Sequence, residues 1–452
     1  MHFRIFILLF VLTNSFSVSA NAKDTLTGAM VSAYNTSGLL EQNRAVLRAA
    51  DEDVATAASQ LAPVVSWASS VSHSGSGSSS FDTSANASLS ASYTVYDGGK
   101  NDLGLEAAKF SVLATRSKLV NVEQNVLFGA VTAYLGVIRE TENVALRENN
   151  LSVIREELRA ANDRFEVGEI TKTDVALAEA RLAASNSALA VAKGSYEKAV
   201  ASYISAIGEK PNTPEYPNFV PEVPSSLESA ITIALTEHPS IGEIKNLVKV
   251  SEINSKIADL ATGFTISLGS SVSLDEEGET SGNLSVTASG PIFSGGKLYS
   301  SSRKKIALKE QVLARLYSSK ISIEQNVTNA FSSLQVAQAA KLAAEEQIRA
   351  TEVALKGVKE EAILGARTTL DVLNAEKDLL DARMQLISAK VDENLSLYRL
   401  LLQIGRLTVD YLGLPVVQYD VEKYYDLVKN SPASNTKSGR KLDTILKSLA
   451  SD

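Results

Sequence analysis

Two aspartates each stand three positions after a threonine: Asp174 follows Thr171, and Asp371 follows Thr368. At this spacing the threonine hydroxyl and the carboxylate satisfy free backbone amides at the start of a helix, so both pairs predict helix starts. A carboxylate that caps a helix keeps its negative charge and can still attract cations. The local sequence therefore leaves two roles open for each aspartate, a structural cap and a cation-attracting group.

Residues suited to covalent or metal catalysis are scarce. The chain has no cysteine and three histidines, of which His73 falls in an expected strand and His238 precedes a proline. Neither stands with a nucleophile or with further metal ligands. The glycine-rich stretch 74–77 lacks the Lys-Ser/Thr of a phosphate-binding loop. We therefore predict no catalytic residues, no metal, no cofactor and no enzymatic activity.

Two long stretches without proline must position the aspartates. They run over 99–167 and 296–364, 69 residues each, and as single helices they would be about 100 Å long. From Val137 to Phe165, apolar residues recur every seven positions, and the second stretch keeps this phase except at Lys341. Such spacing is typical of supercoiled helices packed lengthwise on neighbours.

The chain also repeats itself. Gly99 and Gly168 recur 197 residues later as Gly296 and Gly365, and Asp174 recurs in the same register as Asp371. This agreement predicts a tandem structural repeat. In each half we expect a helix before the long one, over 26–61 and over 227–261, the latter interrupted by a proline. A helix of about 37 residues should follow each tight turn, so that two shorter helices stacked end to end match one long helix.

Between these helices the hydrophobic period changes to two. Residues 84–96 alternate between apolar and polar side chains, and the weaker stretch 65–71 precedes them. The second half has matching stretches over 265–274 and 282–293. Each half therefore predicts a β-hairpin with one apolar and one wet face. The Ala/Ser-rich composition alone would also suit a soluble sandwich.

The two ends of the chain carry different signals. Arg4, the apolar residues 5–12 and the small residues before position 23 predict a cleaved signal peptide, too short to span a membrane. Its removal would change the formal net charge from −8 to −9, which argues against nucleic acid as a partner. Five prolines over 211–224 predict a linker. The tail after Leu407 suggests an ordered extension that packs on this linker, with residues 431–440 disordered.

Four amphipathic strands cannot close a barrel, and an open sheet in lipid would leave backbone groups unpaired. Three copies would supply twelve strands, enough for an outer-membrane barrel with a polar interior. Trp67, Tyr93 and Tyr96 would then form an aromatic belt near the strand ends. For Trp67, packing inside a soluble sandwich is the alternative.

At the turns and strand ends, the sequence resembles the TolC-like outer-membrane efflux family. Arg164-Phe165-x-Val167-Gly168-x-x-Thr171-x-x-Asp174-Val175 and the run 365–373 are similar to the family's two helical-hairpin turns. Tyr96-Asp97-Gly98-Gly99-Lys100 and its copy at 293–297 resemble its strand-to-helix junctions. The resemblance spans about 26–415. The stretch from 405 to 415 is similar to members that serve type I secretion.

The resemblance implies a mixed fold of helices and transmembrane strands. In a homotrimer, tandem helical hairpins would form a periplasmic α-barrel below a twelve-stranded outer-membrane barrel. The segments of each chain would be a signal peptide (1–22), a periplasmic helix (23–62), a β-hairpin (63–97), a long helical hairpin (98–207) and a proline-rich equatorial linker (208–226). They would continue with a second periplasmic helix (227–262), β-hairpin (263–294) and helical hairpin (295–404), and end with a C-terminal equatorial extension and disordered tail (405–452).

The resemblance also implies partners and a cargo path. The channel would stand in the outer membrane of a Gram-negative bacterium, among its lipids, and reach into the periplasm. It would export drugs, or proteins by type I secretion, when docked to a periplasmic adaptor and an inner-membrane pump of the ABC, RND or MFS type.

Carried over by position, the family's site lies at the helical tips. Asp371 would face the pore constriction, where three converging carboxylates would repel one another and bind cations. Arg367 would lock the closed tip by reaching Thr173 or Asp174 of a neighbouring hairpin. The adaptor would seat on Val167-Gly168 and Leu364-Gly365.

Two positions depart from the family pattern. Members often carry an aromatic residue and a second acid where this chain has Ala362 and Asn374, which implies a weaker lock and a less cation-selective ring at Asn374. A second function also stays open: an exported trimeric coiled-coil scaffold or adhesin without transport. Such a stalk would need neither alternating strands nor glycine-capped hairpins.

Overall fold

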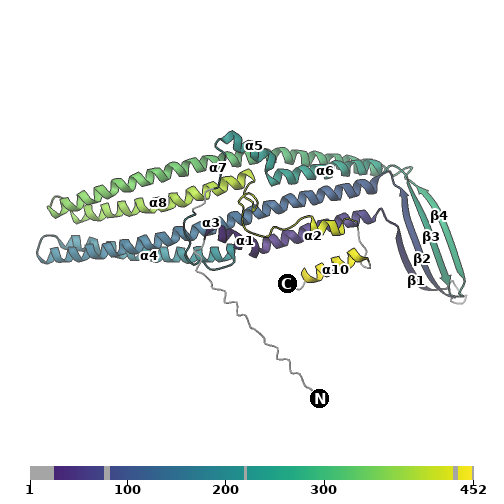
Figure 1. The fold of residues 1–452 in the computed structure, drawn as a ribbon, viewed down its shortest axis with the longest axis horizontal. Coiled ribbons are helices and arrows are strands. Elements are labelled where there is room, and N and C mark those ends of the chain that lie inside the picture. Colours follow the sequence, from purple (N-terminus) through teal and green to yellow (C-terminus); the bar gives the residue numbers. More distant parts are fainter. Residues whose placement is uncertain (1–24, 76–81, 218–220, 431–435, 450–452) are drawn as a thin grey trace, which may run out of the picture.

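The computed structural model describes residues 25–75, 82–217, 221–430 and 436–449. Within these ranges the molecule is elongated, with a β-sheet at one end and two helical tips at the other (Figure 1). The expected signal peptide lies outside the described residues.

The two longest helices run most of the way from the sheet to the tips. They are α3 (Lys100–Glu166) and α7 (Lys297–Ile363), 67 residues each. Both follow a glycine in the left-handed region, Gly99 with φ 85° and Gly296 with φ 82°, where a residue with a Cβ would be strained. The long helices predicted over 99–167 and 296–364 are thus present.

Shorter helices line each long one. On the tip side, α4 (Lys172–Ile207) returns along α3, and α8 (Thr369–Ile404) returns along α7. On the sheet side, α2 (Gly38–Ser59) lies along α3, while α6 (Pro239–Leu260) packs against both α3 and α7. Figure 1 shows two shorter helices sharing the length of one long helix, as the sequence predicts.

One predicted helix is wrong in its continuity. The stretch 26–61 forms two helices, α1 (Leu26–Thr36) and α2, because Ser37 leaves the helical conformation and its hydroxyl accepts the Leu40 amide at 3.3 Å. The corresponding break in the second half separates α5 (Leu227–Glu237) from α6 at His238, where the sequence predicts it from the following proline.

The four strands form one antiparallel sheet in the order β1-β2-β3-β4. They are β1 (Val64–Ser74), β2 (Asp82–Tyr96), β3 (Thr265–Asp275) and β4 (Thr280–Ser289). The two hairpins predicted from the two halves therefore join through β2 and β3. Strands of 10 to 15 residues are long enough to cross a bilayer at a tilt.

The two faces of the sheet differ in polarity. On one face serine hydroxyls bond across the strands, with Ser66 and Ser90 2.9 Å apart and Ser273 and Ser281 2.8 Å apart. Apolar side chains on the other face are exposed, among them Leu89, Val272 and Val286. No part of the described chain covers the apolar face, and no described helix is long and apolar enough to cross a membrane.

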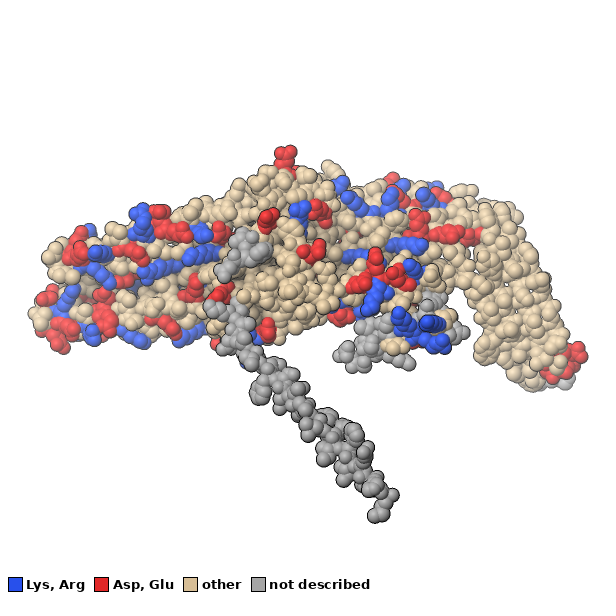
Figure 2. Space-filling view, in the orientation of Figure 1, with Lys and Arg blue, Asp and Glu red and all other residues tan. Residues whose placement is uncertain are grey.

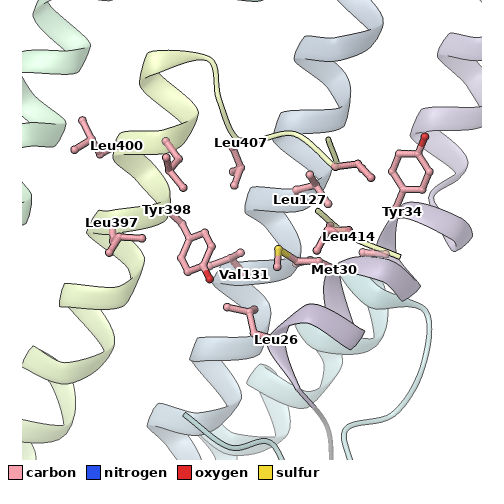
Figure 3. Packing of buried hydrophobic residues seen from close by; sticks show 14 of the residues in the cluster. Leu26, Met30, Tyr34, Leu127, Val131, Leu397, Tyr398, Leu400, Leu407 and Leu414 are labelled. Atoms are coloured by element: carbon pink, nitrogen blue, oxygen red, sulfur yellow. The ribbon is translucent and has the colours of Figure 1, made fainter. Parts of the chain in front are cut away.

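The main core lies midway along the molecule. There α1 and the segment after α8 pack against α3 and α8, and Met30, Leu127, Val131 and Tyr398 meet at its centre (Figure 3). Each of these four side chains is at most 1 % exposed. This core, which lies between the sheet and the tips, therefore packs the two repeats against each other.

The C-terminal extension packs on the first repeat. Its tyrosine Tyr411 donates a hydrogen bond to the Glu222 carbonyl at 3.1 Å, which joins the extension to the proline-rich segment as predicted. Two helices follow, α9 (Lys423–Val428) and α10 (Lys437–Leu449). The prediction of disorder over 431–440 is therefore wrong for Lys437–Arg440, and residues 431–435 lie outside the described ranges.

Candidate functional site: the hairpin tips

Each helical hairpin reverses through a glycine. Gly168 has φ 80° and Gly365 has φ 76°. In both turns the next amide reaches back along the chain, from Glu169 to the Arg164 carbonyl and from Ala366 to the Glu361 carbonyl, each at 2.9 Å. These are the bonds of a glycine-terminated helix end, which satisfy carbonyls that the helix leaves free. The two tips are therefore close copies of each other.

The helices after both turns start with complete capping boxes. The Asp174 carboxylate accepts from the Thr171 amide at 2.9 Å and from the Thr171 hydroxyl at 2.7 Å. In the second hairpin, Asp371 accepts from the Thr368 amide at 2.9 Å and from its hydroxyl at 2.8 Å. The threonines are the N-cap residues and the aspartates close the boxes, which confirms the structural role.

These bonds also set the charge of the two aspartates. The Thr368 amide and hydroxyl lower the pKa of Asp371, and the positive charge of Arg367 adds to the effect. The Thr171 hydroxyl and amide lower the pKa of Asp174 in the same way. Both carboxylates are therefore ionised at neutral pH, so the capping role leaves the negative charge in place.

Arg367 lies in the turn just before the second capping box. Its Nε donates to Glu361 of the same hairpin at 2.8 Å, and both side chains are half exposed. The predicted contact with Thr173 or Asp174 concerns a neighbouring hairpin and stays a prediction. Thr173 is exposed and available for it.

Asn374 has a partner that the sequence does not indicate. The Arg181 guanidinium of α4 donates to its side-chain oxygen at 2.9 Å and so links the first hairpin to the second. The position that departs from the family pattern is thus part of an inter-hairpin bond. Arg181 stands seven residues after Asp174, but nothing in the local sequence indicates Asn374 as its partner.

Lys359 is a second residue that sequence reasoning missed. Its ammonium lies 2.5 Å from Glu376 of α8 and 3.4 Å from Glu157 of α3. It therefore bridges three helices and both hairpins just inside the tips. No local pattern marks Lys359 among the charged residues of α7.

The extreme ends of the tips are apolar and exposed. Val167 is 72 % exposed and Leu364 is 83 % exposed, and each precedes a turn glycine. Exposed apolar groups at the same place on both hairpins suit a surface that another protein covers.

The three aromatic residues predicted for the membrane belt lie on one face of the sheet. Trp67 pairs with Leu89, while Tyr93 and Tyr96 pair with Leu268 and Ile266. A bulge between Thr94 and Tyr96 interrupts the register beside Tyr96, and such an extra residue re-aims the side chains that follow it. All three are exposed.

Among the described residues, no group of three or more His, Cys, Asp or Glu side chains is placed to hold a metal ion.

Comparison with known proteins gives a consistent result. The family model described as outer membrane efflux protein matches residues 31–209 and 255–406. The outer membrane efflux protein BepC of Brucella suis is 35 % identical over 419 residues, covering 91 % of this chain and 92 % of BepC. The alkaline protease secretion protein AprF of Pseudomonas aeruginosa is 24 % identical over 60 % of this chain and 59 % of AprF.

Among solved structures, the Campylobacter jejuni CmeC outer membrane channel superposes with a TM-score of 0.77 at 17 % identity, covering 90 % of each chain. At this identity the likeness concerns the fold.

Proposed function

Because this chain belongs to the outer membrane efflux protein family, we propose that three copies of it assemble into one channel-tunnel. The chain is an export channel of the outer membrane that extends into the periplasm. To this function the proposal adds that three chains form a trimer with a twelve-stranded barrel, and that an adaptor and a pump dock to it. The cargo would be drugs, or proteins by type I secretion.

The sheet is the observation that carries this proposal. Its outer strands β1 and β4 pair on one side only, and one face exposes Val65, Trp67, Leu284 and Val286, each at least 65 % exposed. In hydrocarbon such edges would leave backbone groups unsatisfied, and in water such a face would aggregate. Edge-to-edge closure of three sheets removes the free edges and turns the serine face toward a water-filled interior.

The helical part supports the same assembly. Two helical hairpins of equal length extend from the same sheet in each chain. Three chains would therefore place six tips at one level. Their ionised aspartates, the inter-hairpin bonds of Arg181 and Lys359, and the apolar ends at Val167 and Leu364 would then form a ring. In this assembly the ring is the constriction, and the apolar ends are the seats for a periplasmic adaptor that couples the channel to an inner-membrane pump.

Single-channel recording tests the proposal. Purified protein should run as a trimer in mild detergent and insert into planar bilayers with a small, stable conductance. The non-transport alternative, a trimeric scaffold or adhesin, gives trimers without conductance. Monomers that neither assemble nor conduct would contradict both functions.

A further inference from the structure

The C-terminal helix α10 concentrates positive charge in an acidic chain. Residues 429–449 contain five lysines and arginines and one acidic residue, whereas the whole chain has a net charge of −8. Lys437, Arg440 and Lys441 are exposed. None of the three forms an ion pair with another described residue. Figure 2 shows basic side chains gathered on the molecule's underside beside the sheet.

The opposite side of α10 fixes the helix on the molecule. Leu442 is 8 % exposed and packs in one cluster with Ala55 of α2 and with Tyr424 and Val428 of α9. The α9 segment is tied down in turn, because the Tyr424 hydroxyl donates to Glu52 at 2.7 Å. The basic face of α10, Lys437, Arg440 and Lys441, is therefore held outward rather than swinging on a free tail.

Arg116 of α3 adds a second attachment for α9. Its guanidinium lies 3.4 Å from the Glu422 carboxylate, donates to the Val421 carbonyl at 3.2 Å and stacks over Tyr425 with 5.4 Å to the ring centroid. These contacts join the start of the C-terminal helices to the longest helix of the first repeat.

The attachment places α10 next to the sheet. Ala55 lies four residues before the end of α2 at Ser59, which is about 6 Å along a helix, and β1 starts at Val64. In Figure 1 the N-terminal end of α10, which carries the basic residues, is the end nearer the sheet. If the sheet crosses the outer membrane, these charges lie close to the level of the periplasmic head groups, where screening over about 8 Å leaves attraction effective.

We propose that the basic face of α10 binds anionic phospholipid head groups of the periplasmic leaflet. The inference rests on the proposed barrel, because the barrel sets the level of the membrane. Lipid suits this face better than an acidic protein does, since the basic residues lie where a continuous anionic surface would pass. The helix would act as a second membrane contact that steadies the equatorial region against the bilayer.

A single fluorescent probe tests the proposal in the full-length protein. The chain has no cysteine, so Thr444→Cys provides one labelling site. Thr444 is exposed and stands three and four residues after Lys441 and Arg440, on the same helix face. The labelled channel is reconstituted into nanodiscs of phosphatidylcholine, with or without phosphatidylglycerol, that contain a head-group spin label. Quenching should be stronger with the anionic lipid and should fall as salt is added.

The variant Lys437→Gln/Arg440→Gln/Lys441→Gln should abolish the difference between the two lipid mixtures. A matched variant that neutralises three exposed basic residues near the tip, Arg155→Gln/Arg159→Gln/Lys172→Gln, should retain it. Equal quenching in both mixtures, or an unchanged difference in the α10 variant, would overturn the proposal. Equal quenching in both mixtures would favour an acidic protein as the partner of the basic face of α10.

Channel recording distinguishes a lack of lipid binding by α10 from a failure of the proposed channel function. The α10 variant should conduct as the unmodified protein does, because α10 lies away from the tips. A conducting protein whose quenching ignores lipid charge would refute lipid binding alone. A protein that forms no channel would refute the proposed function, and with it the membrane level on which the lipid contact depends.

Discussion

At the scale of single residues, the tip aspartates combine two roles in one group. Hydrogen bonds from Thr368 hold the Asp371 carboxylate at the start of α8 and lower its pKa, so the cap itself keeps the charge available to a cation. Asp174 has the same bonds in the first hairpin. Because each box also depends on a threonine hydroxyl, removing the threonine separates the effect of the cap from the effect of the charge.

We predict that Asp371→Ala weakens the block of single-channel current by multivalent cations. The ring of carboxylates in the proposed constriction would lose the charge that holds the cation. Because the pKa of Asp371 is lowered, block of the unmodified channel should persist as the pH falls from neutral to mildly acidic. Titration of current with a trivalent cation in planar bilayers measures both effects.

The variant Thr368→Ala is the control, because it breaks the same capping box and leaves the Asp371 carboxylate in place. If both variants lower block equally, loss of the cap explains the effect. Unchanged block in Asp371→Ala would remove this residue from the pore ring.

Asp51 of α2 carries a buried charge that the export function does not use. The side chain is 1 % exposed, and neither carboxylate oxygen has a hydrogen-bond partner among the described residues. Burial raises the pKa of Asp51 to about 6, with Arg116 opposing the rise and Glu52 adding to it. The folded state therefore binds a proton at Asp51 more tightly than the unfolded chain does.

We predict that Asp51→Asn raises the free energy of unfolding at pH 8 by on the order of 2 kcal/mol. The favourable contribution of protonated Asp51 is complete below the pKa of the unfolded chain, near 4, and is lost as the pH rises through about 6. The gain from the substitution should therefore vanish below about pH 4. Thermal unfolding followed by circular dichroism over this pH range measures it. Asp53→Asn, at an exposed position of α2, should change little, and a gain independent of pH would contradict the assignment.

At the scale of elements, the ends of α4 and α8 meet the breaks between the short helices. Gly405 follows α8 with φ 82°, and a Cβ there would lie 2.8 Å from the His238 Cα. Gly208 follows α4, where a Cβ would lie 2.8 Å from the Thr36 hydroxyl oxygen. The nearest neighbour of Gly405 is backbone, whereas the nearest neighbour of Gly208 is the Thr36 side chain, whose Cβ also lies only 3.0 Å away. Because a side chain shifts more easily than backbone, we expect Gly208 to tolerate alanine better than Gly405.

We predict that Gly405→Ala destabilises the protein by roughly 1–3 kcal/mol through left-handed strain and the backbone clash, and that Gly208→Ala costs less. Gly194→Ala is the matched control. Gly194 lies inside α4 with no atom near its added Cβ, so alanine should stabilise the helix by up to about 1 kcal/mol. Thermal unfolding of the three variants measures the order of their stabilities. A tolerated Gly405→Ala would show that the junction with His238 can open.

Elements that depend on neighbours in the sequence were predictable. The capping boxes need a threonine and an aspartate three residues apart, and both are where the spacing places them. The bulge beside Tyr96 has one trace in the sequence, since Val95 and Tyr96 are adjacent and end the alternation. The polar composition of residues 437–440 predicts disorder, although Leu442 holds that helix to α2 and α9.

Bonds between the hairpins could not be predicted. Arg181 and Asn374 are 193 positions apart, and Lys359 meets Glu157 only because α7 settles beside α3. These contacts depend on how two rigid hairpins align sideways, and one chain's sequence does not set that alignment locally.

At the scale of the whole molecule, closure of the tips would depend on bonds between hairpins. We predict that Arg367→Ser makes the closed channel leak, because a neighbouring hairpin would lose a polar partner and Glu361 would lose its bond to Arg367. Higher resting conductance and greater uptake of a large antibiotic by cells that produce the variant would show the leak.

Arg349→Ser is the control, since Arg349 pairs with Glu346 one turn earlier on the same helix and is exposed. It should remain as impermeable as the unmodified channel. Equal leakage in both variants would indicate general loosening of α7 and would contradict a specific lock at Arg367.

The equal length of α3 and α7, 67 residues each, restricts how such a chain can evolve. Losing seven residues from α3 and the seven facing residues from α4 would leave the first tip about 10 Å short of the second. In the proposed trimer, an adaptor could then contact only every second tip. Lengthening or shortening the tunnel therefore requires the same change in both halves of the gene. Because an insertion in one half alone would separate the levels of the two tips, we expect the length of the hairpins to stay constant even where most surface residues change.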